Sequence, residues 1–228
     1  MSRRTAASVK VTSAAGNRDA ERSYSHIGTM QGQATFAGTN GECAELLALT
    51  YSFVEYSPPM EIRRIRADEG LRLKALRLRA LADSPMAFGS TLAREQAYSD
   101  ALWHERAAVG AASDRVMTIV AEHDNHLLGM AIGFLPESPD APDPTMVGVF
   151  VDAAVRRQGV GALLIEKVID WAKAQKSARG SARLLISIAD GNEPALALYR
   201  RAGFRPTGVA RPSAHTPDLV EYEMVLEL

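Results

Sequence analysis

The chain has 228 residues, a formal net charge of −1 and 46% hydrophobic residues, which suits one globular domain with an ordinary core. A charge this close to zero gives no support for a general nucleic-acid binder, and no apolar run reaches the length of a membrane span. The single cysteine, Cys43, excludes an intramolecular disulfide framework and a cysteine-based zinc cluster. We therefore expect a cytoplasmic protein that binds no metal, no nucleic acid and no membrane.

Residues 1–59 differ in composition from the rest of the chain. Up to Asn40 they are rich in Ser, Ala, Thr and Gly and lack sustained periodicity, which favours disorder. The first residues are basic and loosely resemble an organelle transit peptide, but a flexible extension is the preferred interpretation. Whether this part is translated or functional stays open. A domain pattern begins at Met60, directly after two prolines, so we expect one domain over residues 60–228.

Hydrophobic periodicity predicts a regular series of strands and helices after Met60. Asp68 and Ser99 stand where the N-caps of the first two helices belong, and Asp83–Thr91 between these helices is predicted to be a loop. The predicted strands are Glu61–Arg66, Arg115–Glu122, Leu127–Leu135, Val147–Val151, Arg183–Ile188, Phe204–Val209 and Leu219–Leu226. The predicted helices are Glu69–Ala82, Asp100–Ala112, one that begins at Gly159, and Pro194–Ala202.

One stretch joins a buried strand to a helix through glycines. Val147–Val151 is the strand, Asp152–Gln158 is a polar turn, and the helix begins at Gly159. The first turn of a helix carries unpaired N–H groups and partial positive charge, and glycine lets a ligand approach the backbone closely. Arg156 and Arg157 add full positive charge. This combination suits a phosphate or pyrophosphate, although glycine at such a junction also serves tight packing alone.

The glycine pattern distinguishes among known phosphate loops. A P-loop is excluded because Ala162 and not lysine follows Gly161, and a dinucleotide loop is disfavoured because Leu164 takes the place of its third glycine. The stretch instead matches Arg/Gln-x-x-Gly-x-Gly/Ala through Arg156, Gly159 and Gly161. This pattern resembles the acetyl-CoA pyrophosphate loop of the GNAT N-acetyltransferase superfamily.

A second stretch resembles the other signature of the same superfamily. Asn192, an alanine, Tyr199 and the pair Gly203-Phe204 follow one another at the matching spacings. Two motifs in the right order are far more specific than one, and the order of predicted elements is also that of the GNAT fold, so the resemblance extends to Leu228.

The resemblance implies an α/β fold and a set of functional residues. The GNAT-type sheet is mixed and mostly antiparallel, has helices on both faces, and is opened between the strands at 147–151 and 183–188. Backbone groups of Val149, Phe150 and Val151 would pair with the pantetheine arm of acetyl-CoA. The pyrophosphate would be held by seven consecutive residues, Arg156, Arg157, Gln158, Gly159, Val160, Gly161 and Ala162.

The resemblance also implies the activity. Asn192 would contact the cofactor, and Tyr199 would stand near the thioester sulfur as the catalytic acid, against the alternative of an aromatic residue on a buried helix face. The expected enzyme moves an acetyl group from acetyl-CoA to a primary amine by direct attack. The alternative is a non-catalytic acyl-CoA-binding regulatory module. The general base stays open among Glu122, Glu137 and a carbonyl-bound water.

The acceptor is expected to be a small-molecule or peptide amine, and a homodimer is compatible with the sequence. The family places its acceptor groove beside the first two helices. Four acids stand in the loops predicted there, which favours a cationic acceptor over an anionic one: Asp83, Glu137, Asp140 and Asp143.

Overall fold

The computed structural model describes residues 60–137, 143–179, 182–213 and 219–228. The predicted flexible extension over residues 1–59 lies outside the described residues, and so does Asp140 of the proline-rich loop. No helix in the described ranges combines the length and the apolar composition that crossing a membrane requires.

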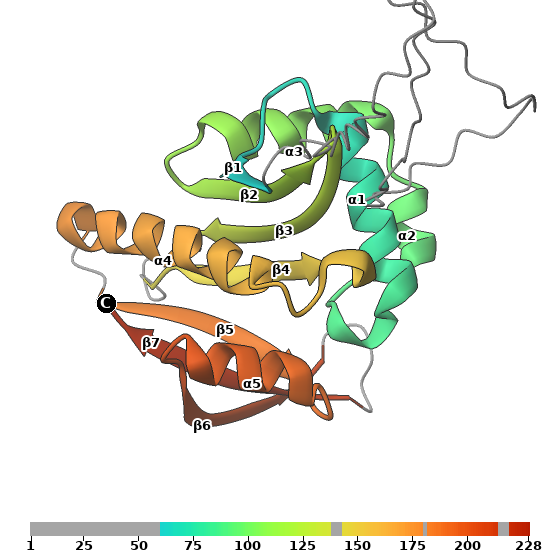
Figure 1. Cartoon of the computed structure of the whole chain (residues 1–228). Helices are drawn as coiled ribbons and strands as arrows, with labels where there is room; N and C mark the ends of the chain where they lie inside the picture. The colour runs from blue at the N-terminus through green and yellow to red at the C-terminus, as the bar shows by residue number, and fades with distance from the viewer. Residues whose placement is uncertain (1–59, 138–142, 180–181, 214–218) are drawn as a thin grey trace, which may run out of the picture. The chain divides into compact units, whose positions relative to one another are not determined.

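A seven-stranded sheet forms the centre of the described domain (Figure 1). The strand order is β1-β2-β3-β4-β5-β7-β6, and all neighbouring strands are antiparallel except β4 and β5. This confirms the expected mixed, mostly antiparallel sheet. The strands are β1 Glu61–Arg64, β2 Val116–His123, β3 His126–Phe134, β4 Thr145–Val151, β5 Arg183–Ala189, β6 Arg205–Pro212 and β7 Val220–Glu227.

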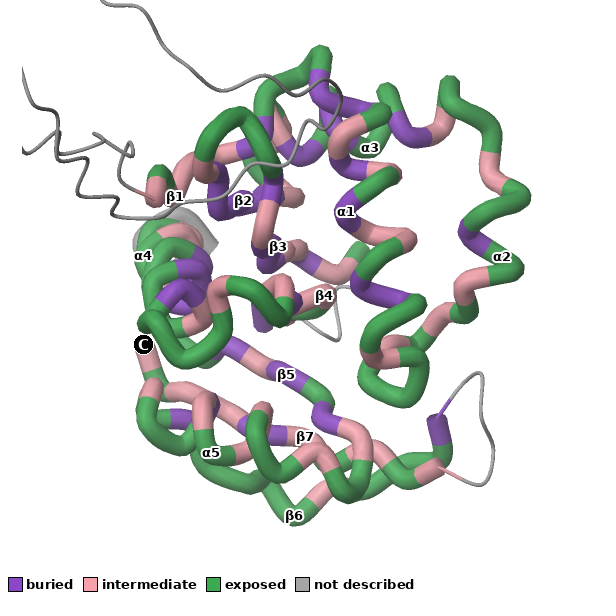
Figure 2. Tube along the Cα trace, turned by 45° about the vertical axis from the view of Figure 1, so that its right-hand side comes forward, coloured by how far each residue is buried: buried purple, intermediate pink, exposed green. Residues whose placement is uncertain are grey.

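Helices cover both faces of the sheet. In Figure 1, α4 and α5 pass in front of the strands, whereas α1 and α3 pack against β2 and β3 on the other side and α2 lies beside α1. Figure 2 shows buried residues along the inner sides of α1 and α4, while β6 at the sheet edge is mostly exposed. The helices are α1 Gly70–Asp83, η1 Pro85–Ala87, α2 Leu92–Gln96, α3 Asp100–Ala112, η2 Ala153–Val155, α4 Val160–Arg179 and α5 Glu193–Arg201.

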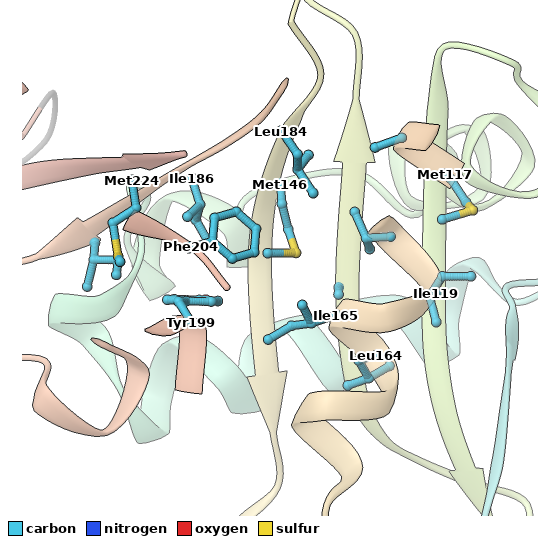
Figure 3. Packing of buried hydrophobic residues seen from close by; sticks show 14 of the residues in the cluster. Met117, Ile119, Met146, Leu164, Ile165, Leu184, Ile186, Tyr199, Phe204 and Met224 are labelled. Atoms are coloured by element: carbon cyan, nitrogen blue, oxygen red, sulfur yellow. The ribbon is translucent and has the colours of Figure 1, made fainter. Parts of the chain in front are cut away.

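Alternate residues of the central strands enter two hydrophobic clusters. Ile119 of β2 packs in the cluster that contains Leu164 and Ile165 of α4, part of which is drawn in Figure 3. Its neighbour Val120 belongs to the cluster that contains Trp103 of α3. Successive strand residues point to opposite faces, so the apolar runs in the sequence supply both clusters at once.

The sheet is opened between β4 and β5. The two strands have seven residues each but share one register pair, Thr145 with Leu185. Beyond this pair they spread apart toward the right of Figure 1. The expected opening is confirmed, and it corrects one detail of the sequence interpretation. Val147, placed in a fully buried strand by its apolar neighbours, is 39% exposed because β4 has lost its neighbour on that side.

The starts of the first helices test the predicted caps. Ser99 caps α3 by accepting a hydrogen bond from the N–H of Leu102 at 3.3 Å, as predicted. The predicted cap Asp68 is wrong: Glu69 is the N-cap residue of α1 and no side chain caps that helix. The short α2 was not predicted, because five residues are too few to show a helical period.

Candidate active site

A cavity of about 750 Å³ occupies the opening between β4 and β5. Ligand sites of drug-like size fall in the same range of volumes. On one side the cavity is bordered by residues 145–149 of β4, and on the other by the ends of β5 and α5. Residues of α1, α2, α3 and the loop after α1 close its third side: Leu73, Arg77, Ala87, Phe88, Gly89, Glu95, Leu102, Trp103, Glu105, Arg106 and Val109.

A bulge distorts β4 where it borders the cavity. Between the register pairs Ile132–Val147 and Met130–Phe150, β4 advances three residues while β3 advances two. Gly148 lies in this interval with φ +64°, a conformation that glycine adopts without strain. A bulge re-aims the neighbouring peptide groups, and a glycine inside a strand pattern is the signal that could have predicted it.

The three residues expected to pair with the pantetheine arm have different surroundings in β4. Val149 lines the cavity. Phe150 is buried in the core and pairs with Met130 of β3, and Val151 pairs with Gly129 at the end of the strand. Their side chains therefore contribute to the core and to the edge of the opening, which leaves backbone groups as their means of contacting a ligand.

The turn before α4 is held in place by its own arginine. Nε of Arg156 donates to the carbonyl oxygen of Val151 at 2.9 Å, and its Nη2 forms an ion pair with Asp83 at the end of α1. Arg157 has φ +62° in the left-handed region. The amide of Gln158 turns back to the carbonyl oxygen of Ala154 at 3.3 Å. The side chains of Arg156 and Gln158 thus organise the loop, and the exposed Arg157 keeps its charge available.

The first turn of α4 presents bare backbone. Gly159 has φ +85°, and a Cβ atom added to it would meet nothing within 4 Å. The N–H groups of the next residues, Val160 to Ala162, belong to the first turn, whose donors have no partner inside a helix. Gly161 differs from Gly159, because a Cβ atom there would lie 3.1 Å from Cδ2 of Leu198 on α5. Gly159 fits the approach of a phosphate, while Gly161 combines backbone exposure with close helix packing.

Asn192 and Tyr199 lie on the opposite side of the opening, and both line the cavity. Oδ1 of Asn192 accepts a hydrogen bond from the N–H of Ala195 at 3.3 Å, so this side chain caps α5. Tyr199 is 6% exposed and its ring meets the ring of Phe204 edge-on, 5.9 Å between centroids (Figure 3). Burial raises the pKa of the Tyr199 phenol above its ordinary value of 10.0, because the phenolate is poorly solvated there.

The carboxylates considered as general bases lie elsewhere. Glu122 and Glu137 do not line the cavity among the described residues. Burial by itself would raise the pKa of Glu122, but hydrogen bonds and charges from Arg72 and Arg63 lower it overall. Glu122 is therefore a fixed anion of an ion-pair network on β1, β2 and α1, and its geometry does not support a role as base.

Two of the four acids expected to favour a cationic acceptor are engaged in ion pairs. Asp83 pairs with Arg156, and Asp143, which is buried, pairs with Arg183 at 2.6 Å. Hydrogen bonds from Ser84 and Arg156 lower the pKa of Asp83. The charged residues that line the cavity form a different set, Arg77, Glu95, Glu105, Arg106 and Glu221. This set has three carboxylates and two arginines, so the lining carries one net negative charge, but it comes from residues other than the expected loop acids.

Comparison with known proteins places this geometry in a family. Residues 78–204 match the model of the acetyltransferase (GNAT) family. [Ribosomal protein bS18]-alanine N-acetyltransferase from Salmonella typhimurium is 26% identical over 109 residues, which cover 48% of this chain and 68% of that protein. Human N-acetyltransferase 8 is 32% identical over 96 residues, which cover 39% of this chain and 38% of that protein.

Solved structures of acetyltransferases share the fold. A GNAT-family acetyltransferase from Streptococcus pneumoniae superposes with a TM-score of 0.63 at 20% identity, covering 75% of this chain and 99% of that one. The putative acetyltransferase yncA from Salmonella typhimurium, solved with acetyl-CoA, superposes with a TM-score of 0.59 at 18% identity, covering 75% of this chain and 95% of that one.

Proposed function

Because the chain belongs to the GNAT acetyltransferase family, we propose that it transfers an acetyl group from acetyl-CoA to a primary amine. The observation that carries the proposal is the cavity in the opened sheet, which has residues 145–149 of β4 on one side and Asn192 and Tyr199 on the other. The bare first turn of α4 follows the end of this same strand β4 along the chain. The relative that acetylates an alanine of ribosomal protein bS18 supports an amine as the acceptor class. A small-molecule or peptide amine fits this class.

The residues present fit acetyl-CoA as the donor substrate. The N–H groups of Val160 to Ala162 and the charge of Arg157 would hold the pyrophosphate, with Gly159 allowing close approach and Arg156 fixing the loop. β4 has no neighbour beyond Thr145 on the side of β5, so backbone groups of Val149 would be open to pair with the amide groups of the pantetheine arm. That the structural neighbour yncA was solved with acetyl-CoA supports acetyl-CoA as the donor substrate.

The reaction has two requirements, a deprotonated amine and a proton donor for the departing thiolate. A primary amine such as that of lysine has a pKa of about 10.4 and must lose its proton before it attacks the thioester carbonyl. Binding of both substrates in one cavity would favour this attack. The departing thiolate, with a conjugate pKa of about 8.5 by analogy with cysteine, is stabilised by a proton donor. A phenol with its ordinary pKa of about 10 is protonated at neutral pH and can donate to the sulfur, and burial raises the pKa of Tyr199 further.

Two measurements test the proposal. Coenzyme A should raise the melting temperature by mass action more than NAD or ATP, which lack the pantetheine arm. Acetyl-CoA mixed with a panel of primary amines should then release free thiol in proportion to acetylated amine. A larger shift with NAD than with coenzyme A would contradict the donor assignment. A strong shift without thiol release from any amine would favour the regulatory acyl-CoA-binding module.

A further inference from the structure

Two arginines surround one buried carboxylate where α1, α2 and α3 meet the cavity. Glu95 is 3% exposed and accepts hydrogen bonds from Nε and Nη2 of Arg77 at 3.1 and 2.9 Å. Nη1 of Arg106 lies 3.6 Å from Oε2 of the same carboxylate. Burial alone would raise the pKa of Glu95, but these arginines lower it overall, so the group stays ionised. Two positive charges thus meet one negative charge, and one positive charge is left over.

Donor groups without partners lie at the same place. Trp103 is 1% exposed, lines the cavity, and its Nε1–H has no hydrogen-bond partner among the described residues. In the same ranges, the guanidinium of Arg77 donates to Glu95 through Nε and Nη2, and its Nη1 makes no hydrogen bond. Indole and guanidinium groups donate and do not accept. A buried N–H left unpaired costs free energy, so this arrangement suits a ligand that brings acceptor oxygens.

Aromatic rings fix the orientation of both guanidinium groups. Arg77 lies over the ring of Phe88 at 4.6 Å, and Arg106 lies over Tyr98 and Trp103 at 4.8 and 4.9 Å. Stacking restrains the planes of the guanidinium groups and leaves their edges for planar anions. A carboxylate matches this edge geometry.

The unpartnered nitrogen is close to the strand that would hold the donor. Nη1 of Arg77 lies 4.0 Å from the point that a Cβ atom would occupy on Gly148, next to Val149 of β4. A molecule that binds there through its anionic group, and whose amine reacts beside β4, would have only a few covalent bonds between the two groups. Glu105, which is exposed, and Glu221 of β7 also line the cavity, and a carboxylate suits an ammonium group.

We infer that Arg77, Arg106 and Trp103 form a carboxylate subsite, and that the acceptor is a free α-amino acid. This inference rests on the proposed N-acetyltransferase function and narrows its acceptor. Carboxylate and amine are close together in a free amino acid. They are far apart in a dipeptide, and the carboxylate is replaced by a neutral amide in an amino-acid carboxamide.

The experiment measures kcat/KM for thiol release with L-amino acids, each compared with its own carboxamide and with dipeptides that begin with it. The best amino acid should exceed its carboxamide by about 10- to 100-fold, the range expected for hydrogen bonds to a charged group. Arg106→Gln should reduce this ratio about tenfold, mainly through the KM of the amino acid. Arg94→Gln, which removes an equal charge from an exposed position on α2 outside the cavity lining, is the matched control and should leave the ratio unchanged.

Titration of the best amino acid into protein saturated with coenzyme A gives a readout that needs no turnover. Equal kcat/KM for amino acids and carboxamides, or a ratio that Arg106→Gln leaves unchanged, would overturn the inference. Thiol release only with amines that lack a carboxylate would also overturn it while the N-acetyltransferase proposal stands. Amino-acid binding that depends on Arg106, without thiol release from any amine, would support the subsite and contradict the proposed reaction. Absence of both binding and thiol release would refute both.

Discussion

Tyr199→Phe isolates the proposed proton donor from the packing of its ring. The ring is buried and touches Phe204 edge-on at 5.9 Å, and phenylalanine retains this contact. We therefore expect the free energy of unfolding to change by less than about 1 kcal/mol. The affinity for acetyl-CoA should also be nearly unchanged, because the substitution leaves the first turn of α4 and the backbone of β4 as they are.

The expected loss of rate follows from the environment of the phenol. General acids contribute about 10²- to 10⁴-fold, and the contribution is largest when the pKa of the acid lies near the operating pH. Burial moves the pKa of Tyr199 upward, further away from neutral pH. We therefore expect kcat to fall by about 10²-fold, at the lower end of this range.

The pH profile gives an independent check on the same residue. The rate should rise with pH as the amine loses its proton, and the parent should show no falling limb up to about pH 10, because the raised pKa keeps the phenol protonated. Thiol release measured across this range for the parent and for Tyr199→Phe tests both statements. Tyr222→Phe, which alters an exposed tyrosine on β7, serves as the control. An unchanged kcat in Tyr199→Phe would remove Tyr199 from the mechanism.

The glycine loop and the ion-pair network support two further predictions. Gly161→Asp should weaken coenzyme A binding about 10- to 100-fold in calorimetric titration, through charge repulsion, whereas Gly161→Ala should be mild because it meets only the flexible end of Leu198 at 3.1 Å. Equal losses would show that crowding and not charge decides this position. Burial opposes ionisation of Glu69, but hydrogen bonds and charges from Arg63 and Arg72 lower its pKa from 4.5 to about 2. The contribution of the Glu69 carboxylate to the free energy of unfolding, about 3 kcal/mol, should be present above pH 4.5 and lost as the pH falls toward 2. Glu69→Gln should lower the melting temperature at pH 7 and flatten its decline in acid, and a decline as steep as the parent's would contradict this.

Local features of the fold could be predicted because their causes are local. The glycine turn before α4, the N-cap Ser99 and the proline in the first turn of α5 each depend on residues within one turn of the chain. The opened sheet has no such local signal, because β4 is as apolar as a covered strand. Only the family resemblance predicted an opening between β4 and β5, and the single register pair is visible only in the structure. For the same reason the exposure of Val147 was not predicted.

The acceptor side of the cavity could not be predicted because it is made by contacts between distant residues. Arg77 and Glu95 are 18 residues apart, and α2, which carries Glu95, is too short to show a period. Asp83 and Arg156 are 73 residues apart, so the sequence gives no sign that this acid is already neutralised. Counted as free charges, the loop acids favour a cationic acceptor. Asp83 and Asp143 are paired with Arg156 and Arg183 and are not free charges, whereas the positive charge left beside Glu95 favours a carboxylate at that place.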